Sequence, residues 1–166
     1  STQWFRDKIK EFGTPTSANL IRDGKRTSVP TFGLLNMFVY DPKGKEKLPY
    51  YDTFPLVLPI EKYNNGFLGI NLHYLSIPMR IRLLDRLTET ANNKKFDEST
   101  RLNADYSKLK NIDLIKPCLK RYLAGQVKSK FRKVGADEFI IATLLPVQRF
   151  KKQSDNYVFG KSRGMV

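Results

Sequence analysis

Lysine and arginine residues gather in one part of this sequence, and side chains of this kind bind anions. The stretch from Lys116 to Lys133 contains seven of them and no acidic residue. Two aromatic residues, Tyr122 and Phe131, are interleaved with the cations. Each cation that meets a phosphate releases a condensed counterion, so such a run is typical of proteins that bind a nucleic acid backbone. The stretch therefore predicts a phosphate-binding surface.

Other cations extend this predicted surface. We expect phosphate contacts from three arginines of a predicted helix, from five cations of the run and from three cations that follow it: Arg80, Arg82, Arg86, Lys120, Arg121, Lys128, Lys130, Arg132, Arg149, Lys151 and Lys152. Arginine suits this role because its planar guanidinium group makes paired hydrogen bonds to phosphate. The sequence shows no helix-turn-helix spacing, no zinc finger and no RNP aromatic motif. We therefore expect binding to double-stranded DNA without sequence preference. The alternative is a solvated face that keeps the protein soluble.

The whole chain is strongly basic. Its 166 residues include 30 lysines and arginines against 16 acidic residues, a net charge of +14. Such an excess attracts phosphate backbones or acidic protein surfaces. Hydrophobic residues make up 40% of the chain, which indicates a folded core, and no apolar run approaches the roughly 20 residues of a membrane helix. The predicted partners are DNA or other proteins, and not a membrane.

Residues that could bind a metal ion or act as nucleophiles form no recognised pattern. The single cysteine, Cys118, and the single histidine, His73, are far apart, whereas a zinc site needs about four ligands at short spacings. Both are more typical of packed residues. The sequence has no G-x-S-x-G elbow and no P-loop. Scattered carboxylates could hold Mg²⁺ for a nuclease only if the fold brought them together: Asp52, Glu61, Asp85, Asp97 and Glu98. We predict a protein that is not an enzyme and has no metal or other cofactor.

Aromatic residues outside the basic run are candidates for a protein interface. Tyr50 and Tyr51 lie in an aromatic and proline-rich segment, and they could stack on bases, form an interface or cover one end of a small barrel. The two ends of the chain carry further aromatic residues beside cations. Such ends are a common way for subunits of an assembly to bind their neighbours, and they are equally a common way to bind nucleic acid. The interface candidates are Trp4, Phe5, Tyr50, Tyr51, Tyr157 and Phe159.

The middle of the chain is predicted to form β-strands. Residues Thr31–Tyr40, Tyr50–Ile60 and Phe67–Tyr74 are rich in aromatic and aliphatic side chains and are separated by turn signals. Pro55 and Pro59 indicate an edge strand or a strand that changes partner. Asn64–Gly66 is a hairpin turn, because asparagine and glycine tolerate positive φ. The expected fold is α+β, with a small curled antiparallel sheet or SH3-like barrel flanked by helices.

Helices are predicted around this sheet. After Ser76, an apolar stripe of Ile77, Ile81, Leu84 and Leu87 indicates a helix whose arginines Arg80, Arg82 and Arg86 point elsewhere. We also predict helices over Asp113–Leu123 and Ala136–Leu145. For Gln126–Val134 we favour a strand with Lys128, Lys130 and Arg132 on one face and Val127, Ser129 and Phe131 on the other; a helix is the alternative. The predicted division is an N-terminal helix and basic arm (1–30), one α+β domain (31–150) and an extended basic tail (151–166).

Three segments carry a resemblance to a known family. Met37–Leu75, Lys116–Leu123 and Ala136–Phe150 resemble a family of small virion-associated proteins of large contractile-tailed bacteriophages, labelled DNA end protectors. The resemblance implies a protein made in the host cytoplasm and carried in the virion. There it would contact either the genome end or the neck, tail or baseplate proteins, and a homo-oligomer is compatible with such an assembly. It supplies no catalytic residue.

Overall fold

A computed structural model describes residues 26–90, 109, 111–134, 139–144 and 150–166. Three of the predicted contact residues, Trp4, Phe5 and Arg149, lie outside the described residues. The predicted N-terminal helix and most of the predicted basic arm lie outside them as well.

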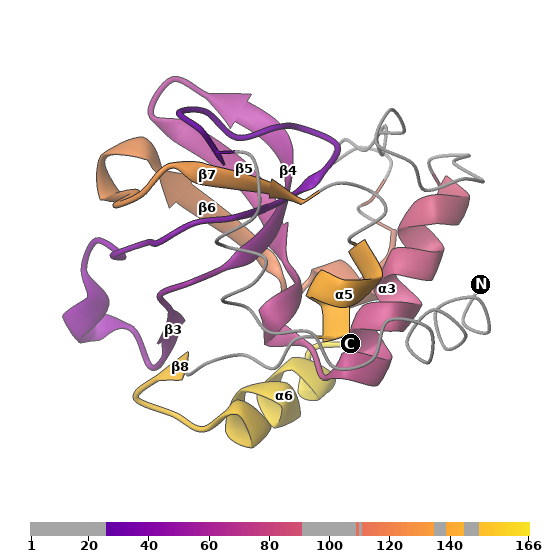
Figure 1. Cartoon of the computed structure of the whole chain (residues 1–166). Coiled ribbons are helices and arrows are strands. Elements are labelled where there is room, and N and C mark those ends of the chain that lie inside the picture. The colour runs from indigo at the N-terminus through magenta and orange to yellow at the C-terminus, as the bar shows by residue number, and fades with distance from the viewer. Residues whose placement is uncertain (1–25, 91–108, 110, 135–138, 145–149) are drawn as a thin grey trace.

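The described chain contains a mixed arrangement of antiparallel strands and helices (Figure 1). Six strands form one sheet in the order β1-β7-β2-β4-β5-β6: β1 (Arg26–Thr27), β2 (Leu35–Met37), β4 (Leu56–Tyr63), β5 (Gly66–Asn71), β6 (Leu119–Leu123) and β7 (Phe131–Val134). A small second sheet pairs β3 (Tyr51–Asp52) with β8 (Phe150–Lys151). The helices are α3 (Ile77–Thr90), α5 (Phe139–Leu144) and α6 (Asp155–Gly164), with 3₁₀ turns η1 (Lys45–Lys47), η2 (Leu72–Tyr74), η3 (Asp113–Ile115) and η4 (Ala124–Gln126). The predicted α+β class is confirmed.

The six-stranded sheet curls on itself without closing into a barrel. Its two edges in the described chain are β1 and β6. The end of β6 meets the chain that follows β2, because the Leu123 amide donates to the hydroxyl of Tyr40 at 2.9 Å. Tyr40 also forms an isolated bridge with Val127. The curled sheet was predicted correctly, and the alternative of an SH3-like barrel was not.

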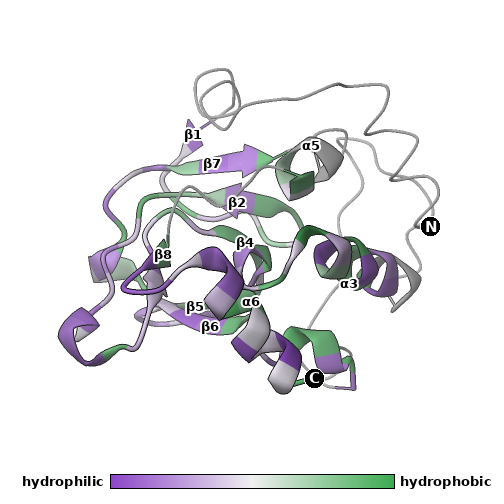
Figure 2. Ribbon diagram, turned by 90° about the horizontal axis from the view of Figure 1, so that it is seen from below, coloured by the Kyte–Doolittle hydropathy of each residue, from purple (hydrophilic) through white to green (hydrophobic). Residues whose placement is uncertain are grey.

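Both faces of the sheet are covered by apolar side chains. Inside the curl, five aromatic rings contact one another with centroids 4.8 to 6.1 Å apart: those of Phe38, Tyr40, Phe67, Tyr122 and Phe131. The other face packs against the helices, which lie together on one side of the sheet (Figures 1 and 2). The predicted stripe of α3 is buried there at Ile81, Leu84 and Leu87. No helix among the described residues is long and apolar enough to cross a membrane.

Several turns follow from local sequence. Asn64 and Asn65 form the two-residue loop of the β4–β5 hairpin, with Tyr63 opposite Gly66. β4 pairs with β2 only at Leu56 and Val57 and then with β5 alone, with a register shift after Pro59. This arrangement leaves Pro59 beyond the ladder with β2, so its missing N–H costs no bond there.

Two predicted elements were wrong. The residues of β6 were expected to continue a helix from Asp113, but only the η3 turn forms, and Leu119–Leu123 pairs with β5 instead. The apolar residues of this segment fit either period, and pairing with β5 places Tyr122 against Phe67 in the aromatic cluster. The tail was expected to be extended, yet Asp155–Gly164 is helical. The Ser154 hydroxyl caps it by accepting from the Tyr157 amide at 3.2 Å.

Candidate nucleic-acid interface

The connection between β6 and β7 carries two exposed cations of the basic run, Lys128 and Lys130. Its backbone is held against the chain after β2. The amide of Lys128 donates to the carbonyl of Val39 at 2.8 Å, and the amide of Val39 donates to the Ser129 hydroxyl at 2.8 Å. Two residues before Lys128, the carbonyl of Gln126 accepts from the Asp41 amide at 3.0 Å. Lys128 and Lys130 are exposed. Their ammonium groups therefore project from a fixed backbone, which reduces the entropy lost on binding.

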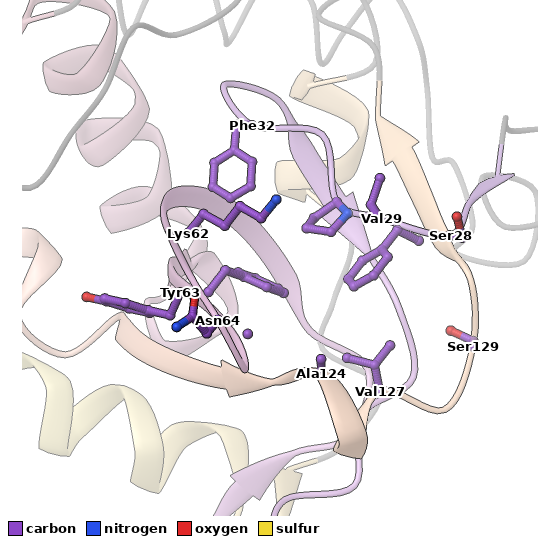
Figure 3. Close-up of a pocket in the computed structure, with 13 residues that line it drawn as sticks. Ser28, Val29, Phe32, Lys62, Tyr63, Asn64, Ala124, Val127 and Ser129 are labelled. Atoms are coloured by element: carbon purple, nitrogen blue, oxygen red, sulfur yellow. The ribbon is translucent and has the colours of Figure 1, made fainter.

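The segment from Val127 to Arg132 separates two pockets of different chemistry. On one side a pocket of about 510 Å³ lies between this segment, the β4–β5 hairpin and the chain before β2 (Figure 3). Val127, Ser129 and Phe131 line it from the connection, and Phe32 and Phe67 complete an apolar wall. Lys62 and Asn64 lie at its polar border.

The other side of the segment carries cations. A pocket of about 200 Å³ is lined there by Arg26, Lys130 and Arg132 together with apolar side chains such as Phe38 and Phe54, with no acidic residue in its lining. The alternation predicted for Gln126–Val134 places Lys130 and Arg132 opposite Val127 and Phe131, and the two pockets agree with it. Only Phe131–Val134 is paired as a strand, so the prediction of a strand is confirmed for its second half.

Two further cations of the run come from β6. Arg121 is exposed, and its guanidinium group lies 4.4 Å from the centre of the Tyr63 ring and donates to the Asn65 side chain at 2.8 Å. Lys120 is half-buried, with its ammonium 4.1 Å from the centre of the Tyr74 ring. Burial lowers the pKa of Lys120 below its ordinary value.

The three arginines of α3 do not share this surface. Arg80 is only 1% exposed. Its guanidinium group donates to the carbonyls of Leu72, Leu75 and Thr143 at 2.8 to 3.0 Å, and burial lowers its pKa to about 10. Arg82 and Arg86 are exposed, but α3 lies on the opposite side of the molecule from the β6–β7 connection (Figure 1). Helical spacing alone did not distinguish the buried arginine from its neighbours.

Two other predicted positions have structural partners. Arg132 is buried except where it lines the cationic pocket, and it donates to the Lys133 carbonyl. The ammonium of Lys152 donates to the carbonyls of residues 45, 46 and 48 at 2.7 to 3.0 Å, so it closes the η1 turn. Lys151 is exposed on β8. The structure therefore gathers Lys128, Lys130 and Arg132 in one place and leaves Lys151 elsewhere.

The predicted aromatic interface residues lie mostly beside α6. The Tyr50 ring contacts those of Tyr74, Phe150 and Tyr157 with centroids 6.1 to 6.3 Å apart. Tyr157 is 43% exposed, Tyr51 and Phe159 are half-buried, and Phe159 lies under the guanidinium of Arg80.

Of the residues considered for metal binding, Cys118, His73 and Asp52 are buried, whereas Asp97 and Glu98 lie outside the described residues. No group of three or more histidine, cysteine or acidic side chains that could hold a metal ion occurs within the described ranges. Cys118 is buried, and burial raises the pKa of its thiol to about 12. His73 is buried with its Nδ1 2.8 Å from the carboxylate of Asp52. Asp52 also accepts from the Asn71 side chain at 3.1 Å and from the Phe54 amide at 3.0 Å.

Three cations that line pockets were not among the predicted contact residues. Arg26, Lys43 and Lys62 lie outside the basic run of the sequence, and the fold places each of them in the lining of a pocket.

The described chain thus combines a curled antiparallel sheet with exposed cations on the connection between β6 and β7. Over residues 1–163 the chain matches the family described as "Phage T4 terminal DNA protecting protein". The chain belongs to this phage family, as the resemblance of its sequence segments suggested. Comparisons with curated proteins and with solved structures find no match.

Proposed function

We propose that this chain is a non-enzymatic virion protein that binds the ends of linear double-stranded DNA. It holds the DNA through the phosphate backbone and does not read the base sequence. The observation that carries this proposal is the two-sided segment Val127–Arg132, with cations on one side and an aromatic pocket on the other.

The cationic side supports contacts to phosphate. Lys128 and Lys130 are exposed and two residues apart, and the segment is held by the Lys128 amide, which donates to the Val39 carbonyl, and by the Ser129 hydroxyl, which accepts from the Val39 amide. No carboxylate of the described residues lies within 4 Å of either ammonium group. Both charges are therefore available to neighbouring phosphates of one strand.

The aromatic pocket supports a preference for ends. An internal stretch of duplex exposes only its grooves and phosphates, whereas an end also exposes the flat face of its last base pair. An apolar wall with the partly exposed ring of Phe32 suits such a face, because base–aromatic stacking contributes about 1–3 kcal/mol per base. Lys62 at the border can meet a phosphate of the same end.

The test is a competition measured by fluorescence anisotropy. The purified chain binds a labelled blunt duplex, and the competitors are the same duplex unlabelled and the same duplex closed at both ends by hairpin loops. We expect the open duplex to compete much better than the closed one. Equal competition would refute end binding and leave backbone binding.

The alternative is a structural component of the virion, in the neck, tail or baseplate, that binds other virion proteins. In this alternative, the exposed ring of Tyr157 and the basic surface would contact the neighbouring virion proteins. Absence of duplex binding even at about 50 mM salt would favour this alternative, because phosphate contacts are strongest at low salt.

A further inference from the structure

A second pocket, of about 270 Å³, lies beside β6. It is bounded by β6, by the chain from Tyr40 to Asp52 and by η2. Leu123 lines this pocket, and the next residue, Ala124, lines the aromatic pocket of Figure 3. The two pockets therefore flank the end of β6.

The walls of this second pocket are tyrosine rings and cations. Four of the rings are those of Tyr40, Tyr50, Tyr51 and Tyr74. The cations are Lys120 inside the pocket and Lys43 and Arg121, which are exposed. Tyrosine hydroxyls and cations are hydrogen-bond donors for an anion, and the rings can flank a planar or sugar group.

Lys120 is the side chain whose surroundings indicate a bound ligand. It is largely withdrawn from water, yet no carboxylate of the described residues lies within 4 Å of its ammonium group. The ammonium group lies over the face of the Tyr74 ring, 4.1 Å from its centre. Removing an ammonium group from water is unfavourable unless an anion or several acceptors face it. A bound anion would supply the missing partner.

The one carboxylate in the wall, that of Asp52, is already engaged. Oδ2 accepts from His73 Nδ1 and from the Asn71 amide group, and Oδ1 accepts from the Phe54 amide. Asp52 is 5% exposed, so its charge is turned into the protein. The three cations of the pocket, Lys43, Lys120 and Arg121, therefore outnumber this one carboxylate.

The size of the pocket favours the terminus of a DNA strand over an internal stretch of duplex. A volume of 270 Å³ is below the ~300–1,000 Å³ of pockets that take drug-sized ligands, so no duplex enters it. An internal phosphodiester has a nucleotide on both sides and meets only the rim. A terminal phosphate has a neighbour on one side only, and as a monoester it carries about −1.5 to −2 charges at pH 7.

We propose that this pocket takes the terminal phosphate monoester of a DNA strand, with the phosphate on Lys120 and the rim cations Lys43 and Arg121. The proposal rests on the proposed binding of DNA ends and adds the group that is recognised there. The described geometry does not distinguish a 5′ from a 3′ phosphate, so the experiment has an arm for each.

The experiment compares three blunt duplexes of one sequence by anisotropy: one with 5′-phosphates, one with 3′-phosphates and one with hydroxyl ends only. We expect the protein to bind one phosphorylated duplex about tenfold or more tightly than the hydroxyl duplex, as one lost charge-assisted contact implies. Lys120→Met removes the charge and keeps an apolar stem, and it should abolish this preference. Lys43→Gln, at an exposed position, should reduce the preference without risk to the fold. Lys47→Gln, on η1 and outside the pocket lining, is the matched control and should leave it unchanged.

The outcomes separate this proposal from the proposed function. Equal binding of all three duplexes by the wild type would overturn the phosphate site and leave end binding intact. A preference that survives in both Lys120→Met and Lys43→Gln would also overturn it. If no duplex binds, end binding fails. The pocket is then tested by NMR titration with deoxythymidine 5′- and 3′-monophosphate, and absence of shifts that depend on Lys120 would overturn the site as well.

Discussion

Replacing Lys128 and Lys130 together by glutamine should reduce the salt dependence of DNA binding by a predictable amount. Both residues are exposed and lie two positions apart on a hydrogen-bonded segment, and each is expected to meet one phosphate. Each phosphate contact contributes about −0.9 to the slope of log K against log salt concentration, so loss of two contacts reduces the slope by about 1.8. Between 50 and 200 mM salt, the wild type should lose about 12-fold more affinity than the double variant.

The measurement is anisotropy of a labelled blunt duplex at four or more salt concentrations. A double variant of α6, Lys161→Gln with Arg163→Gln, is the matched control, because it removes the same charge from exposed positions far from the connection (Figure 1). We expect the slope of the control to stay close to that of the wild type. If both double variants change the slope equally, net charge and not the geometry of the connection governs binding, and the reasoning is refuted.

Three further predictions concern the scaffold. Arg80→Met should destabilise the protein by about 2–4 kcal/mol, because buried carbonyls, including those of Leu75 and Thr143, lose a charged donor at a cost of about 1–3 kcal/mol each. Urea unfolding measures this, and a loss below about 1 kcal/mol would contradict the role of Arg80 in the fold. Burial alone would raise the pKa of Asp52, but the charge of His73 and the hydrogen bonds outweigh burial and lower this pKa below 3.8. The ionised Asp52 therefore stabilises the fold above about pH 4, and this contribution is lost as the pH falls through the lowered pKa. Asp52→Asn should flatten the acid limb of a plot of stability against pH, and an unchanged acid limb would show that another carboxylate governs it. Gly66→Ala should destabilise by at least the ~1–3 kcal/mol typical of overpacking, because its Cβ would lie 1.8 Å from the Tyr122 carbonyl oxygen. Thermal melting with Gly125→Ala as control tests this, since nothing lies within 4 Å of a Cβ at Gly125; equal melting temperatures for the two variants would contradict it.

The local pattern of residues predicted much of the fold. The sequence predicted three local features correctly: the Asn64–Gly66 turn, the buried stripe of α3 and the alternation of Val127–Arg132. Each of them depends on neighbours within a few positions of the chain. The same logic failed for Leu119–Leu123. Its apolar residues suit both a helix and a strand, and the choice is made by β5, which is some 50 residues away in the chain.

The candidate sites depended on the tertiary structure to a greater extent. The sequence alone determined that the protein is strongly basic and that one run between Lys116 and Lys133 is free of acids. Only the fold decided that Arg80 is buried among carbonyls, that Lys152 closes a turn and that Lys120 lies against a tyrosine ring in a pocket. The physical reason is that charge is a property of composition, whereas access to a ligand depends on which distant segments pack over each side chain. Lys43 and Lys120 illustrate this, because they meet at one pocket only through the curl of the sheet.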